Sequence, residues 1–236
     1  IVITTIVVLI LAVSSPYFFT ISNLDSLQTS IAPNAILAIG MMMLMIMGKF
    51  DLSVGSSMCL SGIACAYCLS RGMGITISVL AGLGVGLVIG SINGLLVAYG
   101  NIEPLIATIG TMYVFRGMSE MIMTGSVATT LRGFPEAFVK FGNGKILGLY
   151  PMVWICIILL ALFGFILKKT YTGKKNYYIG CSEFNAKLMG IHVKWHLMWT
   201  YILSGCLASI AGIMSVARYE TASRYLGKDI QMNIMI

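Results

Sequence analysis

Long apolar segments recur along the chain, and their length is the feature that most limits how the chain can fold. An α-helix needs about 20 apolar residues to cross the hydrocarbon core of a bilayer. Only a helix pairs every backbone N–H and C=O within one segment, so such runs predict an all-α membrane protein, a polytopic transmembrane helical bundle. Seven stretches fit: about 1–20, 28–48, 54–70, 75–99, 104–125, 151–168 and 197–217.

Composition agrees with lipid as the medium around these helices. Hydrophobic residues make up 58% of the chain and charged residues 10%, whereas soluble domains average about 45–50% and about 25%. The basic residues lie in the gaps between apolar stretches. The net charge of +7 therefore predicts membrane flanks and not nucleic-acid binding.

The whole chain, residues 1–236, is expected to form a single transmembrane domain. Ile1 already lies inside an apolar run and Ile236 lies at the start of another. We therefore expect the natural domain to extend beyond both ends of this sequence.

Basic residues in the gaps predict which end of the bundle faces the cytoplasm. The gap of about 168–196 contains one acid, Glu183, and six lysines: Lys168, Lys169, Lys174, Lys175, Lys187 and Lys194. By the positive-inside rule this gap is cytoplasmic. Counting spans then places 49–53 and 100–103 inside as well, and places four gaps outside: 21–27, 71–74, 126–150 and 218–229.

Two local patterns predict helix detail. Ser182 has a side chain suited to an N-cap and Gly190 suits a helix C-terminus, so 182–189 predicts a short cytoplasmic helix. In the fourth stretch small residues recur every four positions, which allows close packing of a neighbouring helix or a sliding surface for a conformational change. They are Ser78, Gly82, Gly86, Gly90, Gly94 and Ala98.

Polar residues within the apolar part are candidates for translocation or gating, because burying them in lipid is costly. Asp51 is either such a residue or a cap for the helix that follows. Arg116 and Glu120 are four residues apart and share a helix face, as a structural ion pair or as a functional pair. Asn93 is expected to hydrogen-bond a neighbouring helix. The full candidate set is Asp51, Ser53, Asn93, Thr108, Arg116 and Glu120.

The sequence contains no pattern that predicts catalysis or metal binding. It has no H-E-x-x-H, no G-x-S-x-G, no phosphate-binding P-loop and no cluster of carboxylates. If ATP and Mg²⁺ power this protein, we expect another chain to bind them, and we predict no cofactor in this one.

Five motifs, in the same order and at similar spacing, resemble the ribose-type ABC permeases. The resemblance covers about residues 30–236, with departures at Lys49, where the family often has glycine, and at Cys181. The motifs are Phe50–Ser56, Ala107–Thr111, Phe115–Gly117, Ile179–Gly180 with Asn185–Ile191, and Leu207–Ile213.

This resemblance implies the permease subunit of an importer for a sugar or sugar-like solute, with about ten spans, of which the last three lie beyond this sequence. It implies a second permease subunit, identical or a sister, two cytoplasmic ATPase subunits and an external solute-binding protein. It also implies an ATPase-coupling segment within the cytoplasmic loop of about 168–196, formed by Ser182, Glu183, Phe184, Asn185, Ala186, Lys187, Leu188, Met189, Gly190 and Ile191.

Two other functions remain open at this stage. An ion-coupled secondary transporter needs buried carboxylates near the middle of the membrane, and Glu120 and Asp51 are the candidates. A membrane enzyme or an assembly scaffold is the other alternative, and the lack of a catalytic motif disfavours the enzyme.

Overall fold

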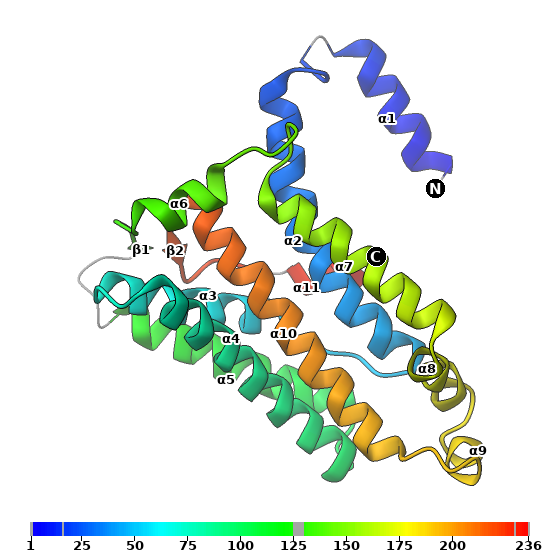
Figure 1. The fold of residues 1–236 in the computed structure, drawn as a ribbon. Helices are drawn as coiled ribbons and strands as arrows, with labels where there is room; N and C mark the ends of the chain where they lie inside the picture. Colours follow the sequence, from blue (N-terminus) through cyan, green and yellow to red (C-terminus); the bar gives the residue numbers. More distant parts are fainter. Residues whose placement is uncertain (1, 16, 125–129, 229, 236) are drawn as a thin grey trace.

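The computed structural model describes residues 2–15, 17–124, 130–228 and 230–235, which form a bundle of helices (Figure 1). The helices that correspond to the seven predicted stretches are α1 (Val2–Ser14), α2 (Ile21–Ile46), α3 (Val54–Ser70), α4 (Ile75–Gly94) with its π-helical continuation η1 (Leu95–Tyr99), α5 (Pro104–Thr124), α7 (Pro151–Lys169) and α10 (Val193–Tyr219). The all-α polytopic fold is therefore confirmed.

Within the described residues, four helices are long and apolar enough to cross a membrane: α2, α4 with η1, α7 and α10. Helix α3 is apolar but has 17 residues. The boundary between the first two predicted stretches was wrong, because α2 begins at Ile21, seven residues before the expected start. Thr20 explains this start, since its side chain accepts a hydrogen bond from the Asn23 N–H and caps the helix.

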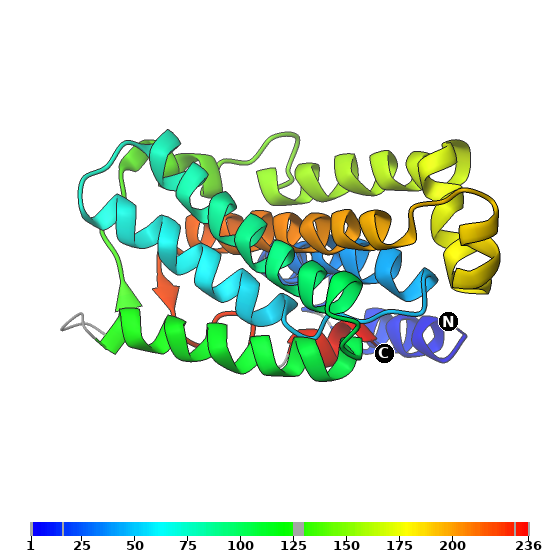
Figure 2. The ribbon, with the colours of Figure 1, turned by 90° about the horizontal axis from the view of Figure 1, so that it is seen from below.

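Helix α10 lies at the centre of the bundle. It packs against α2, α3 and α4, and Figure 2 shows α7 and α5 on opposite sides of it. Its Tyr201 side chain is fully buried. Packing on several sides at once explains why α10 is the most buried of the four candidate spans.

The small residues of α4 lie against α10. A methyl group at Gly86 would collide with the Ser209 side chain and the Gly205 carbonyl oxygen, and one at Gly90 would collide with the Tyr201 backbone. Gly82 and Gly94 also face α10. Close backbone approach of this kind is what small residues permit between membrane helices.

Replacing Gly86 with leucine is expected to destabilise the protein by about 3 kcal/mol or more, the upper range for overpacking, because the groups it meets include backbone. Gly84→Leu is the matched control, since a Cβ there meets nothing within 4 Å. The measurement is Tm in detergent. Equal Tm values for the two variants would contradict this account of the α4–α10 contact.

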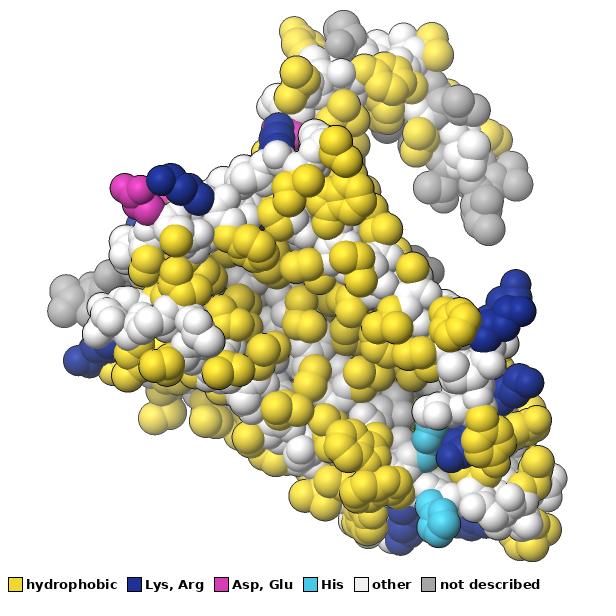
Figure 3. Space-filling model, viewed as in Figure 1, with side chains coloured by type: hydrophobic (Ala, Val, Ile, Leu, Met, Phe, Trp, Pro, Cys, Tyr) yellow, Lys and Arg dark blue, Asp and Glu magenta, His cyan; other side chains and the backbone are white. Residues whose placement is uncertain are grey.

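Polar segments gather at the two ends of the bundle. The three gaps predicted to be cytoplasmic meet at one end of the bundle, which we call the lysine-rich end, because residues from all three line one cavity there: Lys49, Asn101, Ile102, Glu103, Glu183, Lys187 and Lys194. Hydrophobic side chains cover the middle of the face in Figure 3, and Lys and Arg side chains lie toward its two ends. This pattern fits a bilayer around the middle of the bundle.

At the opposite end, the connection between α5 and α7 covers the bundle. It contains β1 (Thr130–Leu131) and α6 (Glu136–Asn143), and residues 125–129 lie outside the described residues. Strand β1 pairs antiparallel with β2 (Ala222–Ser223). Phe134 and Phe138 are buried against the ends of α3 and α10, which explains why this segment stays on the bundle.

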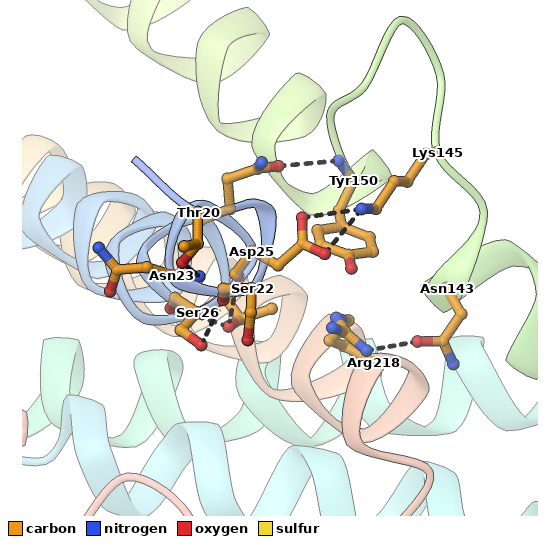
Figure 4. A network of polar contacts seen from close by, with 11 residues as sticks. Thr20, Ser22, Asn23, Asp25, Ser26, Asn143, Lys145, Tyr150 and Arg218 are labelled. Atoms are coloured by element: carbon orange, nitrogen blue, oxygen red, sulfur yellow. Dashed lines mark hydrogen bonds and ion pairs between the residues drawn. The ribbon is translucent and has the colours of Figure 1, made fainter. Parts of the chain in front are cut away.

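A polar network holds this end together (Figure 4). The Lys145 ammonium contacts both carboxylate oxygens of Asp25 at 2.8 and 2.7 Å, and this hydrogen bonding raises the pKa of Lys145. Arg218 donates to Asn143 and lies over the Tyr150 ring, 4.1 Å from its centroid. The network thereby links α2, the segment before α7 and the end of α10.

Candidate functional site

The segment between α2 and α3 enters the bundle. The chain turns at Gly48, with φ of +68°, and α3 does not begin until Val54. Asp51 is 2% exposed and Ser53 is fully buried. The prediction of residues 49–53 as a cytoplasmic connection was therefore wrong for all but its start.

Two contacts with α10 fix the depth of this segment. The Ser204 hydroxyl donates to Asp51 Oδ2 at 3.2 Å, and the Tyr201 hydroxyl donates to the Phe50 carbonyl at 2.9 Å. Ser204 lies eleven residues after the first residue of α10, Val193. At 1.5 Å per residue this is about 16 Å from the lysine-rich end. Asp51 thus lies within the depth of the spanning helices.

A chain of hydrogen bonds connects Asp51 to four helices. Asp51 Oδ1 accepts from the Ser53 N–H at 3.0 Å and from its hydroxyl at 2.6 Å. Asn93 of α4 donates to the Ser53 hydroxyl, and Thr111 of α5 donates to Asn93 Oδ1, both at 2.7 Å. With Ser204 of α10, this Asp51 network joins α3, α4, α5 and α10 through one buried carboxylate.

The structure brings Asp51, Ser53 and Asn93 together and adds two residues that the sequence did not single out as candidates, Ser204 and Thr111. Asn93 makes the interhelical hydrogen bonds expected of it. Ser53 is the N-cap residue of α3 without a side-chain capping bond, and Asp51 accepts from the Ser53 backbone. The Asp51 carboxylate therefore supports the first turn of α3 from outside the helix.

Thr108 is buried but bonds within its own helix. Its hydroxyl donates to the Pro104 carbonyl at 2.7 Å. Thr111, one turn further along α5, is the residue whose hydroxyl reaches Asn93. The motif Ala107–Thr111 contained the correct residue, but which of its two threonines faces α4 depends on how α5 is rotated in the bundle.

Arg116 holds a second segment that enters the bundle. After β2 the chain turns back, and the Arg116 guanidinium donates to the carbonyls of Arg224 and Leu226, each at 3.0 Å, and of Gly227 at 3.2 Å. The segment is held against α3 as well, because a methyl group at Gly55 would collide with the Gly227 carbonyl. The expectation that 218–229 is a simple outer connection was therefore wrong for residues 224–228.

These carbonyls explain how an arginine is accommodated at this depth in α5. A guanidinium carries five N–H donors in a fixed geometry, and three carbonyl oxygens of one short segment accept from it. Glu120, the other member of the predicted pair, lies one turn further along and lines the same pocket as Arg116. Helix α11 (Ile230–Met235) follows the segment and contacts α2 and α3.

The short helix predicted at the lysine-rich end is present as α9 (Glu183–Leu188). The Ser182 hydroxyl accepts from the Asn185 N–H at 3.2 Å, and Gly190 has a φ of +78°, as expected for the two caps. A further helix, α8 (Tyr171–Cys181), precedes it and was not predicted. Thr170 caps α8 by accepting from the Gly173 N–H at 3.1 Å.

Helix α9 has a buried side and an exposed apolar side. Ala186 is fully buried and Ile191 is 5% exposed, whereas Phe184 and Leu188 are 70% and 73% exposed. Three further residues of the predicted coupling segment are exposed as well: Asn185, Lys187 and Met189. The helix therefore presents large apolar side chains to its surroundings at the lysine-rich end.

One ion pair connects α9 to the segment that contains Asp51. Lys49 Nζ lies 2.8 Å from Glu183 Oε1, and Glu183 is the first residue of α9. Helix α8 reinforces this junction, because Gly180 packs against the Ile46 carbonyl at the end of α2. Asp51, with its buried carboxylate, follows Lys49 by two positions in the sequence, so the ion pair lies close along the chain to this carboxylate.

In the described part of the chain, no three His, Cys, Asp or Glu side chains are grouped closely enough to hold a metal ion. The geometry instead consists of two polar segments inside an apolar bundle and one short helix at its lysine-rich end.

Comparisons with known proteins agree with this architecture. A family model described as branched-chain amino acid transport system / permease component matches residues 23–236. The ribose import permease protein RbsC of Escherichia coli strain K12 is 35% identical over 231 residues, which is 97% of this chain and 71% of that protein.

Two further relatives carry other names. The fructose import permease protein FruF of Bifidobacterium longum is 36% identical over 83% of this chain and 56% of its own length. The galactofuranose transporter permease protein YtfT of Escherichia coli strain K12 is 34% identical over 90% of this chain and 64% of its own length. No solved structure matches the chain. The resemblance seen in the five motifs is thus confirmed, and the chain belongs to the ribose-type ABC transporter permease family as a multi-pass protein of the inner membrane.

Proposed function

We propose that this chain is the membrane-spanning subunit of an ABC importer that brings a sugar or sugar-like small solute into the cell. The observation that carries the proposal is the 35% identity to a ribose import permease over 97% of the chain. Relatives named for fructose and galactofuranose import support the same solute class. The chain itself performs no covalent chemistry in this proposal.

The proposed partners follow from the family. A second permease subunit, identical or a sister, completes the membrane part. Separate ATPase subunits bind ATP and Mg²⁺ at the lysine-rich end, which the positive-inside rule places in the cytoplasm. An external protein delivers the solute to the opposite end.

Helix α9 is the ATPase-docking element in this proposal. Three large apolar side chains in and next to this helix are 58–73% exposed: Phe184, Leu188 and Met189. The many lysines at this end of the bundle indicate that these side chains face water and not lipid. Exposed apolar side chains on a short helix are typical of a surface that inserts into a groove of another protein. The capped ends and the buried Ala186 make the helix rigid enough to transmit a displacement.

The ion pair between Lys49 and Glu183 offers a route from the docking element to the membrane interior. A shift of α9 would move Lys49 and with it the segment that carries Asp51. Because the Asp51 network contacts α3, α4, α5 and α10, a small movement there would change how these helices pack.

Exchange of the two charges tests this route. Lys49→Glu and Glu183→Lys are each expected to reduce the solute imported per ATP hydrolysed several-fold, because two like charges then replace the ion pair whose atoms lie 2.8 Å apart. The double exchange is expected to restore most of the coupling. The matched control is the exposed pair Lys140 and Glu136 at the opposite end, whose exchange should change nothing. A double variant as impaired as the single ones would remove Lys49 from the route.

Reconstitution tests the function itself. The permease, its ATPase and its solute-binding protein are placed in proteoliposomes, and uptake of labelled ribose, fructose and galactofuranose is measured. We expect uptake of at least one of these sugars that requires both ATP and the binding protein. Uptake driven by a proton or sodium gradient without the ATPase would instead support the ion-coupled secondary transporter.

A further inference from the structure

A tight hairpin of residues 145–149 precedes α7 and presents two large apolar side chains to its surroundings. We call it the Leu147 hairpin. Ile146 and Leu149 exchange backbone hydrogen bonds of 2.9 and 3.1 Å across it. Leu147, at the turn, is 87% exposed, and Ile146 is 58% exposed. Turn positions usually carry polar residues, so two adjacent apolar side chains here indicate a surface that meets something other than water.

The backbone of the turn indicates that Leu147 is present for its side chain. Leu147 and Gly148 both have positive φ, +52° and +81°, as in the type I′ turns that join paired strands. Such turns prefer glycine, asparagine and aspartate, which tolerate this conformation, whereas leucine is strained in it. Gly148 fits the preference and Leu147 does not. Because Leu147 is both strained and almost fully exposed, we expect a contact outside the chain to compensate for its presence.

The Leu147 hairpin lies against the start of α7. The Trp154 indole N–H donates to the Ile146 carbonyl at 3.0 Å. At the base of the hairpin, Lys145 forms its ion pair with Asp25 of α2 (Figure 4). Trp154 is the fourth residue of α7, and tryptophan near the end of a spanning helix is typical of the membrane–water interface. These contacts place the Leu147 hairpin at the level of that interface.

The apolar surface of the hairpin continues along α7. The chain has no charged residue from Ile146 to Leu167. Three α7 side chains are 43–61% exposed: Ile157, Ile158 and Phe165. Hydrophobic side chains also cover the middle of the face that contains α7 in Figures 1 and 3. An exposed apolar face on a spanning helix suits lipid, so the Leu147 hairpin borders the lipid-facing surface of α7.

The length of α7 explains why apolar side chains are needed before its first residue. The last two of its 19 residues are Lys168 and Lys169, so 17 uncharged residues remain. At 1.5 Å per residue these extend about 26 Å, compared with about 30 Å for the hydrocarbon core of a typical bilayer. A span that is too short thins the bilayer or draws flanking residues toward it. Ile146 and Leu147 supply apolar length at the end of α7 opposite these lysines.

We propose that the Leu147 hairpin is a membrane anchor that inserts Ile146 and Leu147 into the lipid headgroup region beside the start of α7. The partner is a lipid surface, recognised through apolar contact and not through charge, since Lys145 is already paired with Asp25. In this role the hairpin fixes how deeply α7 lies in the bilayer. The proposal does not depend on which solute the protein moves or on what drives the movement.

An external protein, such as the proposed solute-binding protein, is the competing partner. Interfaces between proteins that associate reversibly combine apolar contacts with a polar rim. The exposed tip of the Leu147 hairpin is apolar instead, and it adjoins Trp154 and the lipid-facing surface of α7. The lipid surface is therefore the partner that these observations support.

The first test locates residue 147 relative to the bilayer. Leu147→Cys and Glu136→Cys are made in a Cys181→Ser background, labelled with a nitrobenzoxadiazole fluorophore and placed, with the ATPase but without the solute-binding protein, in lipid nanodiscs. Glu136 is the matched control because its side chain is 86% exposed at the same end. We expect lipids with a nitroxide near the top of the acyl chain to quench the label at 147 at least twofold more than the label at 136. Aqueous iodide should quench it at least twofold less.

Two results of this test would overturn the proposal. Equal quenching at the two positions, by iodide and by the lipid nitroxide, would place Leu147 in water. If the solute-binding protein then protects the label at 147 from iodide, the hairpin is assigned to protein docking. The Cys181→Ser protein without an introduced cysteine gives the background from the remaining cysteines.

The second test uses bilayer thickness and needs no fluorophore. Leu147→Asn keeps the turn, because asparagine tolerates positive φ, but it removes the apolar side chain. In nanodiscs of 14-carbon lipids we expect its Tm to equal or exceed that of the parent, and in 18-carbon lipids we expect its Tm to fall below that of the parent. Lys140→Asn, exposed on α6, is the control and should follow the parent in both. A Leu147→Asn Tm that differs from the parent's by the same amount in both bilayers would contradict the anchor.

Discussion

Replacing Arg116 with alanine is expected to abolish transport and to lower the thermal stability of the permease. The change removes three hydrogen bonds of 3.0–3.2 Å to the carbonyls of residues 224–227. Hydrogen bonds to a charged group are worth about 1.5–3 kcal/mol each, and half-buried Arg116 keeps some access to solvent, so we expect a loss of about 2–4 kcal/mol in total. Tm in detergent and ATP-dependent ribose uptake are the measurements.

Two variants make this result specific. Arg116→Lys is expected to show an intermediate Tm, because an ammonium lacks the planar guanidinium that reaches three carbonyls at once. Arg132→Ala, an exposed arginine on the connection between α5 and α7, should leave Tm and uptake unchanged. A normal Tm for Arg116→Ala would mean that residues 224–227 are held in place by something other than this side chain.

Replacing Asp51 with alanine is the second large effect that we expect. The change leaves the Ser53 N–H and the hydroxyls of Ser53 and Ser204 without the carboxylate that now accepts from them. Each unsatisfied buried polar group costs about 1–3 kcal/mol. We expect a lower Tm, and loss of uptake because the start of α3 is no longer fixed.

The order of three variants tests this explanation. Asp51→Ala should be the most damaging, Asp51→Asn intermediate because an amide keeps one acceptor oxygen, and Ser204→Ala the mildest because it removes one bond of 3.2 Å. Tm and uptake are measured for all three. If Asp51→Asn behaves like the parent in both, the negative charge at this position has no role in stability or transport.

The sequence predicted the spans well because the length of an apolar run directly reports whether a helix can cross a bilayer. Helix α9 was also predictable, since Ser182 and Gly190 are local capping signals that need no tertiary partner. The hydrogen bonds of Asn93 followed from the cost of leaving an amide unsatisfied among apolar neighbours.

The two segments that enter the bundle could not be predicted in the same way. A short polar segment between apolar runs has the same pattern whether it lies at the surface or inside. The depth of Asp51 is set by Ser204 and Tyr201, which lie about 150 residues further along the chain. Arg116 likewise meets carbonyls more than 100 residues away, and backbone carbonyls carry no sequence signal.

Helix α8 was missed for a local reason. Its sequence, Tyr171–Cys181, contains two lysines, two glycines and three tyrosines and has no helical period of apolar residues. What holds it is packing through two glycines: Gly173 against α7 and Gly180 against the end of α2. The position of α8, next to the proposed ATPase-docking helix α9, thus depends on contacts that form only in the folded chain.

Labelling of Cys181 from each side of the membrane tests the orientation on which the account depends. This cysteine is exposed and lies two residues before α9. We predict that a membrane-impermeant thiol reagent modifies Cys181 in inverted membrane vesicles and not in intact cells, with Cys181→Ser as the unlabelled control. Modification in intact cells would place α9 outside the cell, where it could not meet a cytoplasmic ATPase, and would contradict the proposed mechanism.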